Sequence, residues 1–231
     1  MNTDLEAWLQ DRFTESMEGR AERLPAPALR IAPPLAEWER SYFLFALQDG
    51  LFAGAGAEFL VSELCETAPE AGAAQAPYRI FSEGSPRRLL RENVCQLAAA
   101  AWLIYKRGWL PRQVRLQESK PEHRSTGGFD LLVRSAAGEN LIWVETKRSA
   151  AELGKFIADL RACARRGRHA QAECGFPQNH PRYEFCLEAR PRFLWAVAPD
   201  GDFALALGFE ENTLTLEALP SLPPRSHLEF G

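Results

Sequence analysis

The sequence predicts a mixed α/β domain over residues 78–231, preceded by an acidic helical region over residues 1–77. Three observations support this fold class. Residues 85–108 have helix signals at both ends, the segments that follow alternate like strands, and a capped amphipathic helix leads into another strand. From residue 85 the expected order is helix, strand, strand, strand, helix, strand, which mixes the two element types as α/β proteins do.

The N-terminal region is expected to be mainly helical. Between residues 3 and 24, apolar side chains recur at the spacing of one helix face: Leu5, Trp8, Leu9, Phe13 and Met17. Residues 24–35 are rich in proline and predict a linker. Residues 36–66 predict one or two helices, with breaks expected near "QDG" and "GAGA", and residues 66–77 predict a loop.

The helix expected over residues 85–108 opens the second region. Ser85 suits the N-cap, Pro86 suits the first turn, and Gly108 suits the position after the last turn. These signals predict one long helix immediately before the sheet.

Three strands should follow that helix. Residues 113–119 and 128–135 alternate between apolar and polar side chains, and residues 141–147 form the returning strand of a hairpin across the turn "SAAGEN". Ser149 and Glu152 then make an S-x-x-E capping box, which predicts the start of another helix. The remaining strand segments are "RFLWAVAP" (192–199), "DFALALGF" and "TLTLEAL".

Charge is distributed unevenly along the 231 residues, although the formal net charge is only −4. Residues 1–70 hold 13 acidic and 5 basic side chains, whereas the rest hold 18 acidic and 22 basic. The basic side chains concentrate in residues 87–115 and 147–168, which are either solvated helix faces or the place where a polyanion such as DNA would dock. The acidic N-terminal region would suit a partner protein or a homodimer contact.

Cysteine usage and hydropathy indicate a cytoplasmic protein. The five cysteines are odd in number, widely spaced and without a C-x-x-C pair, which is typical of reduced thiols. The longest apolar runs, "LAAAAWLI" and "YFLFAL", are far shorter than a membrane span. The first residues lack the features of a secretory signal, so we expect no contact with a membrane.

The strand "LIWVETK" carries two charges that need an explanation. Side chains alternate along a strand, so Glu145 and Lys147 point to the same face as Trp143. Asp130 lies near the start of the partner strand. A hairpin register that pairs the start of this strand with the end of the returning strand places Asp130 beside Glu145. Two carboxylates and an ammonium group would then meet at one end of the sheet.

Two neighbouring carboxylates repel each other and raise each other's pKa unless a cation lies between them. A divalent metal ion removes that repulsion, and an oxygen-lined site with few protein ligands suits Mg²⁺, with Mn²⁺ as a substitute. The pattern therefore predicts a magnesium site at Asp130 and Glu145.

The spacing Asp130-x14-Glu145-Thr146-Lys147, on a strand, a turn and a second strand, resembles the PD-(D/E)XK nuclease superfamily of restriction-endonuclease-like folds. The resemblance covers roughly residues 85–200 and includes the element order. Glu92 matches a helix glutamate that this family often carries. The sequence departs from the motif in having Gly128-Phe129, and no proline, before Asp130.

The resemblance implies a metal-dependent deoxyribonuclease. Asp130, Glu145 and the carbonyl of Thr146 would bind Mg²⁺, which would polarise the scissile phosphate and activate a water. Lys147 would orient that water or neutralise charge on the phosphorane, and Glu92 would contact the metal through water or position Lys147.

Basic side chains after the motif would grip DNA phosphates without reading sequence. They are Arg148, Lys155, Arg161, Arg165 and Arg168. Small nucleases of this type serve bacterial antiviral defence, repair and mobile-element systems, and one of these settings is expected by analogy.

Each residue also has a plainer interpretation. In it, Asp130 and Glu145 are exposed edge charges that Lys147 pairs for solubility, and Glu92 is a surface partner of Arg88 or Gln96 on its helix. Residues 174–186 hold Cys174, His180 and Cys186 at spacings that match no zinc pattern, so a structured loop is expected there.

Two other function classes remain open from the sequence. A catalytically silent nuclease fold would serve as a binding or scaffold subunit recruited to a partner protein. In the other class, residues 1–77 would act as a helical adaptor for a basic partner. The intact triplet Asp130, Glu145 and Lys147 favours the enzyme.

Overall fold

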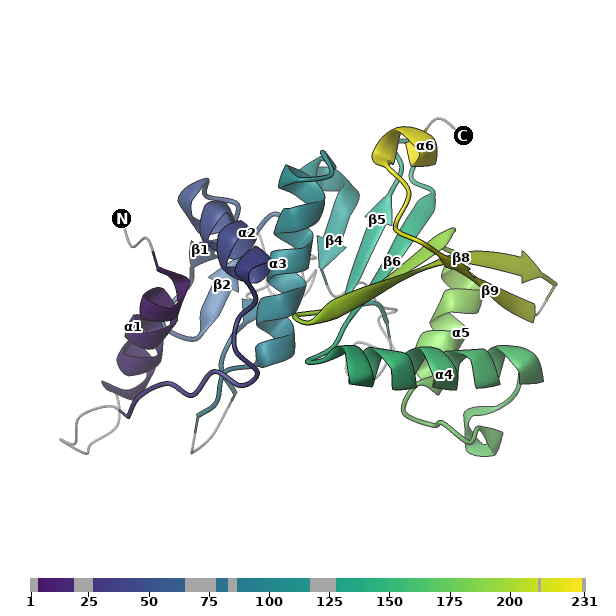
Figure 1. Ribbon diagram of the computed structural model, residues 1–231, viewed down its shortest axis with the longest axis horizontal. Helices are drawn as coiled ribbons and strands as arrows, with labels where there is room; N and C mark the ends of the chain where they lie inside the picture. The colour runs from purple at the N-terminus through teal and green to yellow at the C-terminus, as the bar shows by residue number, and fades with distance from the viewer. Residues whose placement is uncertain are drawn as a thin grey trace, which may run out of the picture.

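The computed structural model describes residues 4–18, 27–64, 78–82, 87–116, 128–211 and 213–229. Within them the chain is an α/β protein with six α-helices, a small three-stranded sheet and a six-stranded mixed sheet (Figure 1). No helix in these ranges is long and apolar enough to cross a membrane.

The N-terminal region contributes two helices and the small sheet. α1 spans Leu5–Glu18 and α2 spans Glu37–Gln48. β1 (Ala53–Gly54), β2 (Phe59–Val61) and β3 (Tyr78–Arg79) pair in antiparallel order.

The helical prediction for residues 36–66 is therefore wrong beyond α2. The chain turns at Gly56, whose φ of +77° is unfavourable for other residues, and the segments on either side pair as β1 and β2. Glycine at such a turn is incompatible with a continuous helix.

α3 spans Arg91–Tyr105 and starts later than the predicted residue 85. The preceding residues are held in an extended arrangement, because Leu89 bridges Phe81 and the Leu90 amide donates to the Ile80 carbonyl. Ser85 and Pro86, the predicted start signals, lie outside the described residues. The predicted stop is correct, since Gly108 follows the end of the helix with a φ of +74°.

The six-stranded sheet begins as an antiparallel meander of β4 (Val114–Leu116), β5 (Leu131–Arg134) and β6 (Asn140–Thr146). α4 (Ala150–Arg166) and α5 (His180–Ala189) then lead into β7 (Phe193–Ala198), which pairs parallel to β6.

The sheet continues with two long antiparallel strands. They are β8 (Gly201–Glu210) and β9 (Thr213–Leu219), and the short helix α6 (Arg225–Glu229) follows. The strand order is β4-β5-β6-β7-β8-β9, so each strand lies next to its sequence neighbour.

Helices cover both faces of this sheet. On one face Leu131, Val133 and Val144 pack in a hydrophobic cluster with α3, α2 and α1. On the other face Leu132 and Trp143 pack against α4 and α5. The alternation of side chains along β5 and β6 thus supplies two cores from one hairpin (Figure 1).

The N-terminal region and the sheet share one core. α2 packs along α3, and the guanidinium of Arg91 donates to Glu39 Oε1 at 2.6 Å in a fully buried ion pair. The domain boundary predicted at residue 77 lies outside the described residues, and apolar residues on both sides of it belong to the same cluster.

Candidate active site

The β5–β6 hairpin brings Asp130 next to the end of β6. Leu131 pairs with Val144, so the same antiparallel register sets Asp130 opposite Glu145. The backbone amide and the hydroxyl of Thr146 both donate to Asp130 Oδ2 at 2.7 Å. The expected meeting of the two acidic positions at one end of the hairpin is therefore present in the structure.

The Glu145 carboxylate is fully buried and surrounded by donors. Its Oε1 contacts Lys147 Nζ at 2.6 Å and Arg182 Nε at 2.9 Å, while Trp143 Nε1 donates to Oε2 at 3.3 Å. Burial, with the nearby Asp130 carboxylate, raises the pKa of Glu145 above its usual range, and the two cations act in the opposite direction. Glu145 is thus no exposed edge charge.

Lys147 lies between acidic and backbone acceptors. Besides Glu145, its ammonium group donates to the Thr146 carbonyl oxygen at 2.9 Å. Burial favours the neutral amine, but the carboxylates of Glu145 and Asp130 outweigh burial and raise the pKa of Lys147. Lys147 therefore remains an ammonium group at neutral pH, and the carbonyl of Thr146 faces this cation.

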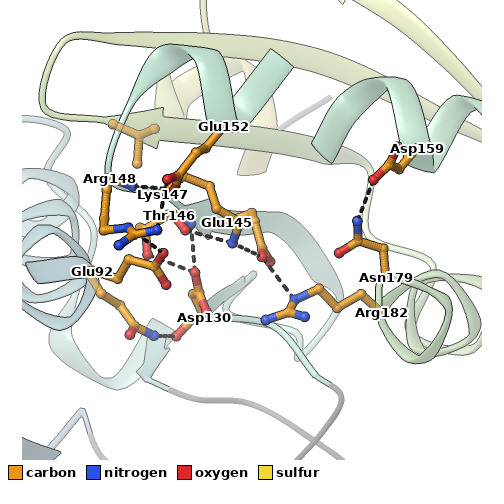
Figure 2. Close-up of polar contacts among 12 residues, drawn as sticks. Glu92, Asp130, Glu145, Thr146, Lys147, Arg148, Glu152, Asp159, Asn179 and Arg182 are labelled. Carbon is orange, nitrogen blue, oxygen red and sulfur yellow. Dashed lines mark hydrogen bonds and ion pairs between the residues drawn. The ribbon is translucent and has the colours of Figure 1, made fainter. Parts of the chain in front are cut away.

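Glu92 extends toward the same place from the first turn of α3. Its carboxylate lies 3.8 Å from the Arg148 guanidinium, and Arg148 also pairs with Glu152 at 2.9 Å. Burial raises the pKa of Glu92, while Lys147 lowers it and Asp130 raises it. Figure 2 shows Glu92 and Arg148 on one side of Asp130, with Glu145 and Arg182 on the other.

The predicted basic residues do not all lie at this site. Arg148 adjoins Glu92, but α4 leads away for 17 residues, about 25 Å, and carries Lys155, Arg165 and Arg168 along or beyond it. Arg161 lines a separate pocket with Asp202 and Phe203 beside β8. Of the five, Arg148 is the one for which the described residues show an ion pair with a carboxylate of the site.

Sequence reasoning missed Arg182. Arg182 lies 37 positions after Glu145 in the sequence and belongs to α5. This helix is found where the sequence predicted the second half of a loop over residues 174–186. Because the apolar residues of α5 follow no clean helical stripe, no local signal indicated a helix there. The charge of Glu145 raises the pKa of Arg182, so this guanidinium stays protonated.

Two polar side chains fix the position of the Asp130 backbone. Gln96 on α3 donates to the Asp130 carbonyl oxygen, and Tyr78 in turn donates to Gln96. Asp130 is thereby fastened at its backbone by α3 and at its carboxylate by Thr146. This support was not apparent from the sequence, since the three segments lie far apart along the chain.

A cavity of about 700 Å³ opens next to Glu92. Its lining includes the exposed arginines Arg30, Arg88 and Arg148 together with Asn93. Arg30 belongs to the proline-rich segment and Arg88 to the stretch before α3, so parts far apart in the sequence create one basic surface beside Glu92.

A second polar group lies at the other end of α4. Cys163, His169 and Cys174 are the one set of three or more possible metal ligands within the described ranges whose ligand atoms all lie within 4.8 Å of one another. The three carboxylates Glu92, Asp130 and Glu145 do not converge that closely. The grouping of Cys174 with Cys186 considered from the sequence is not found, since Cys186 is buried outside this set.

Comparisons of the chain with protein-family models, with curated proteins and with solved structures found no match. The chemistry of the site is therefore the basis for assigning a function.

Proposed function

We propose that the chain is a Mg²⁺-dependent nuclease that hydrolyses DNA phosphodiester bonds. One observation carries the proposal: Asp130, Glu145 and Lys147 meet at the end of the β5–β6 hairpin, next to the N-terminus of α4. The order α3, β4, β5, β6, α4, β7, with β7 parallel to β6, supports the assignment to a restriction-endonuclease-like core.

The residues at the site suit a hard cation. Oδ2 of Asp130 accepts both hydrogen bonds from Thr146, and no partner of its Oδ1 is found among the described residues. The half-exposed Glu92 carboxylate lies on the same side (Figure 2). Carboxylate oxygens are preferred ligands of Mg²⁺, so Asp130 would hold the ion with Glu145 and the Thr146 carbonyl, and Glu92 would assist through water. Bound Mg²⁺ would supply Lewis-acid activation of the phosphate and of a water.

The protein's own side chains have separable roles in this proposal. Thr146 orients the Asp130 carboxylate with two hydrogen bonds. Arg182 and Lys147 contact the buried Glu145 carboxylate and partly offset the rise in its pKa that burial causes. The Lys147 ammonium group would stabilise negative charge on the phosphorane, because a fixed cation in a partly dry site costs no reorganisation during the reaction.

The basic cavity beside Glu92 would hold the DNA backbone. Arg30, Arg88 and Arg148 line it, and all three are exposed. Such contacts give affinity that falls with salt and does not depend on sequence. Lys155, Arg165 and Arg168 would meet phosphates farther along the duplex. A role in bacterial defence, repair or a mobile element, in the cytoplasm and with a partner recruited by the acidic N-terminal region, completes the proposal.

A cleavage assay with a charge-matched control tests this proposal. Wild type, Lys147→Ala and Lys106→Ala are incubated with supercoiled, linear and single-stranded DNA and with RNA, in Mg²⁺ or EDTA. Lys106 is an exposed lysine after α3. We expect Mg²⁺-dependent cutting by wild type and Lys106→Ala, and a loss of about 100-fold or more for Lys147→Ala. Equal cutting by all three proteins, or cutting in EDTA, would overturn the proposal.

A second function is favoured by one specific observation. The Glu145 carboxylate is wholly buried and already satisfied by Lys147, Arg182 and Trp143, as expected for a fold that keeps the site as structure. Such a catalytically silent subunit would bind DNA or a partner protein without a metal. The silent subunit predicts that calorimetry detects no binding of Mg²⁺ or Mn²⁺, and that wild type and Asp130→Asn bind DNA with the same affinity. The nuclease predicts metal binding to wild type that Asp130→Asn abolishes.

A further inference from the structure

The connection between α4 and α5 gathers thiols and imidazoles with unused ligand atoms. Cys163 Sγ lies 3.5 Å from Cys174 Sγ, and a ring nitrogen of His169 is within 4.8 Å of both sulfurs. A tetrahedral zinc ion with Zn–S of about 2.3 Å and Zn–N of about 2.0 Å holds its ligand atoms about 3.3–3.8 Å apart. The group is thus close to the size of a zinc site.

Hydrogen bonds prepare these side chains for a metal. The Nδ1 atom of His169 lies 2.7 Å from the Gly167 carbonyl oxygen, which only accepts, so Nδ1 carries the proton and Nε2 carries the lone pair. His169 Nε2 is buried and has no hydrogen-bond partner among the described residues. The Phe176 amide donates to Cys174 Sγ at 3.3 Å. Partners of this kind orient the ligands of metal sites.

His180 lies beside this group and is the candidate for a fourth ligand, but its ring nitrogens are not within 4.8 Å of all three other ligand atoms, so its ring would have to shift toward the metal. The residue is fully buried, and its ring centroid lies 4.8 Å from that of His169. Its Nε2 is 3.4 Å from the Glu184 carboxylate, but neither Nε2 nor Nδ1 has a hydrogen-bond partner within the part of the chain that the structure describes. Either nitrogen is therefore available to a metal, and a small shift of Glu184 toward the other nitrogen would give the carboxylate–histidine arrangement that is usual around zinc.

Leaving these buried atoms unsatisfied would be costly, because each desolvated polar group without a partner destabilises the fold. A bound cation removes that cost for His169 and His180 together. Two thiolates and two imidazoles select zinc over Mg²⁺ or Ca²⁺, which prefer oxygen ligands.

We propose that Cys163, His169, Cys174 and His180 form a structural Zn²⁺ site that fastens the connection between α4 and α5. The spacing is Cys-x5-His-x4-Cys-x5-His. On binding, the two thiols release their protons and no electron transfer is involved. The proposal does not depend on the nuclease, since the site lies at the C-terminal end of α4.

The zinc site would also affect the candidate active site, because it would fix the position of the helix that carries Arg182. α5 begins at His180 and carries Arg182, which contacts Glu145 at 2.9 Å. Asn179, just before α5, donates to Asp159 of α4 at 3.0 Å (Figure 2). A zinc ion on His180 would hold the first turn of α5 against α4 and so keep the Arg182 guanidinium at the Glu145 carboxylate.

Metal analysis of the full chain tests the proposal. Protein purified with reductant and without chelator is expected to hold about one Zn²⁺ per chain by inductively coupled plasma mass spectrometry. Cys174→Ser and His169→Gln should lose nearly all of it, and Cys186→Ala, a buried thiol of α5 outside the group, should keep it. Replacement by Co²⁺ should give thiolate charge-transfer absorption and the intense visible bands of tetrahedral cobalt.

His180→Gln tests the fourth ligand separately. It should weaken Zn²⁺ binding at least about 10-fold in a competition titration, while the two thiolates remain. Unchanged affinity would remove His180 from the site. Circular dichroism of each variant distinguishes metal loss from failure to fold.

Three results would overturn the zinc site. One is wild-type protein without bound zinc that also fails to take up added Zn²⁺ or Co²⁺. Another is full zinc content in folded Cys174→Ser and His169→Gln. The last is a Cys163–Cys174 disulfide, found by mass spectrometry in protein kept under cytosol-like reducing conditions. Wild-type protein that binds zinc but does not cleave DNA would contradict the nuclease proposal and would still support the zinc site.

Discussion

At the residue scale, protein cations compensate much of the carboxylate charge of the candidate active site. The carboxylates of Glu92, Asp130 and Glu145 face the cations Lys147, Arg148 and Arg182, most of them paired in the structure. A buried carboxylate is stable only when its neighbours compensate its charge, and two cations do so for Glu145. In the proposed nuclease, a Mg²⁺ ion would therefore compete with Lys147 and Arg182 for Glu145, and the substrate phosphate would supply compensating negative charge.

The raised pKa of Lys147 predicts how its contribution to stability depends on pH. A lysine whose pKa is higher in the folded state stabilises the fold fully below the unfolded pKa of about 10.4 and loses that effect as pH rises through the folded value. Lys147→Met should cost about 2 kcal/mol at pH 7, since Arg182 still compensates Glu145. The cost should stay constant to about pH 10 and shrink above it.

Urea unfolding at pH 7, 9, 10 and 11 measures this difference. Lys106→Met, at an exposed lysine, serves as the control and should show no change with pH. A cost of Lys147→Met that is the same at pH 7 and pH 11 would contradict the assigned contacts of this ammonium group.

At the element scale, the N-terminus of α4 sets the geometry beside the site. Ser149 Oγ accepts from the Glu152 amide at 3.3 Å, as the S-x-x-E pattern predicts, and Asp200 accepts from the Ala150 amide at 2.6 Å. These acceptors satisfy amides that a helix leaves without intrahelical partners. Because Lys147 and Arg148 directly precede the cap, the start of α4 determines where both cations lie.

Ser149→Ala is expected to destabilise the protein by about 1 kcal/mol, because the Glu152 amide loses its acceptor. Ser149→Asp should retain most of the stability, since its carboxylate caps the same amide. Thermal unfolding measures both. Ser41→Ala removes the same atoms from an exposed position inside α2 and should be neutral or slightly stabilising. Equal losses at Ser149 and Ser41 would contradict the capping role.

At the scale of the whole molecule, a buried ion pair joins the N-terminal region to the sheet. Arg91 on α3 contacts Glu39 on α2, and it also donates to the carbonyl oxygens of Pro33 at 2.9 Å and Pro34 at 3.1 Å. Both charged side chains are almost completely buried. The proline-rich segment is therefore bound to the fold, and the two regions should unfold together.

Glu39→Gln should cost about 3–5 kcal/mol, because it leaves the buried Arg91 charge uncompensated. The double variant Glu39→Leu/Arg91→Met should recover much of that loss, since no unpaired charge remains. Glu6→Gln, which breaks the exposed pair with Arg40, is the control and should cost under about 1 kcal/mol. Calorimetry should show a single transition throughout, and two separate transitions in wild type would contradict the shared core.

The sequence alone determined the features that depend on neighbouring residues. Alternation marked β5 and β6, the hairpin register set Asp130 opposite Glu145, and the Ser149 cap predicted the start of α4. Each of these depends on a few adjacent positions, whose side-chain directions follow from the local backbone. The meeting of Asp130 with the end of β6 that carries Glu145 and Lys147 could therefore be expected from residue order alone.

The tertiary structure decided what comes from distant segments. Arg182 reaches Glu145 from an unpredicted helix, Arg30 and Arg88 line the cavity beside Glu92, and Cys163 meets Cys174 across the α4–α5 connection. The direction in which a side chain leaves its strand or helix is set within a few residues. Which other segment it meets depends on how whole hydrophobic faces pack, and no short window of sequence contains that information.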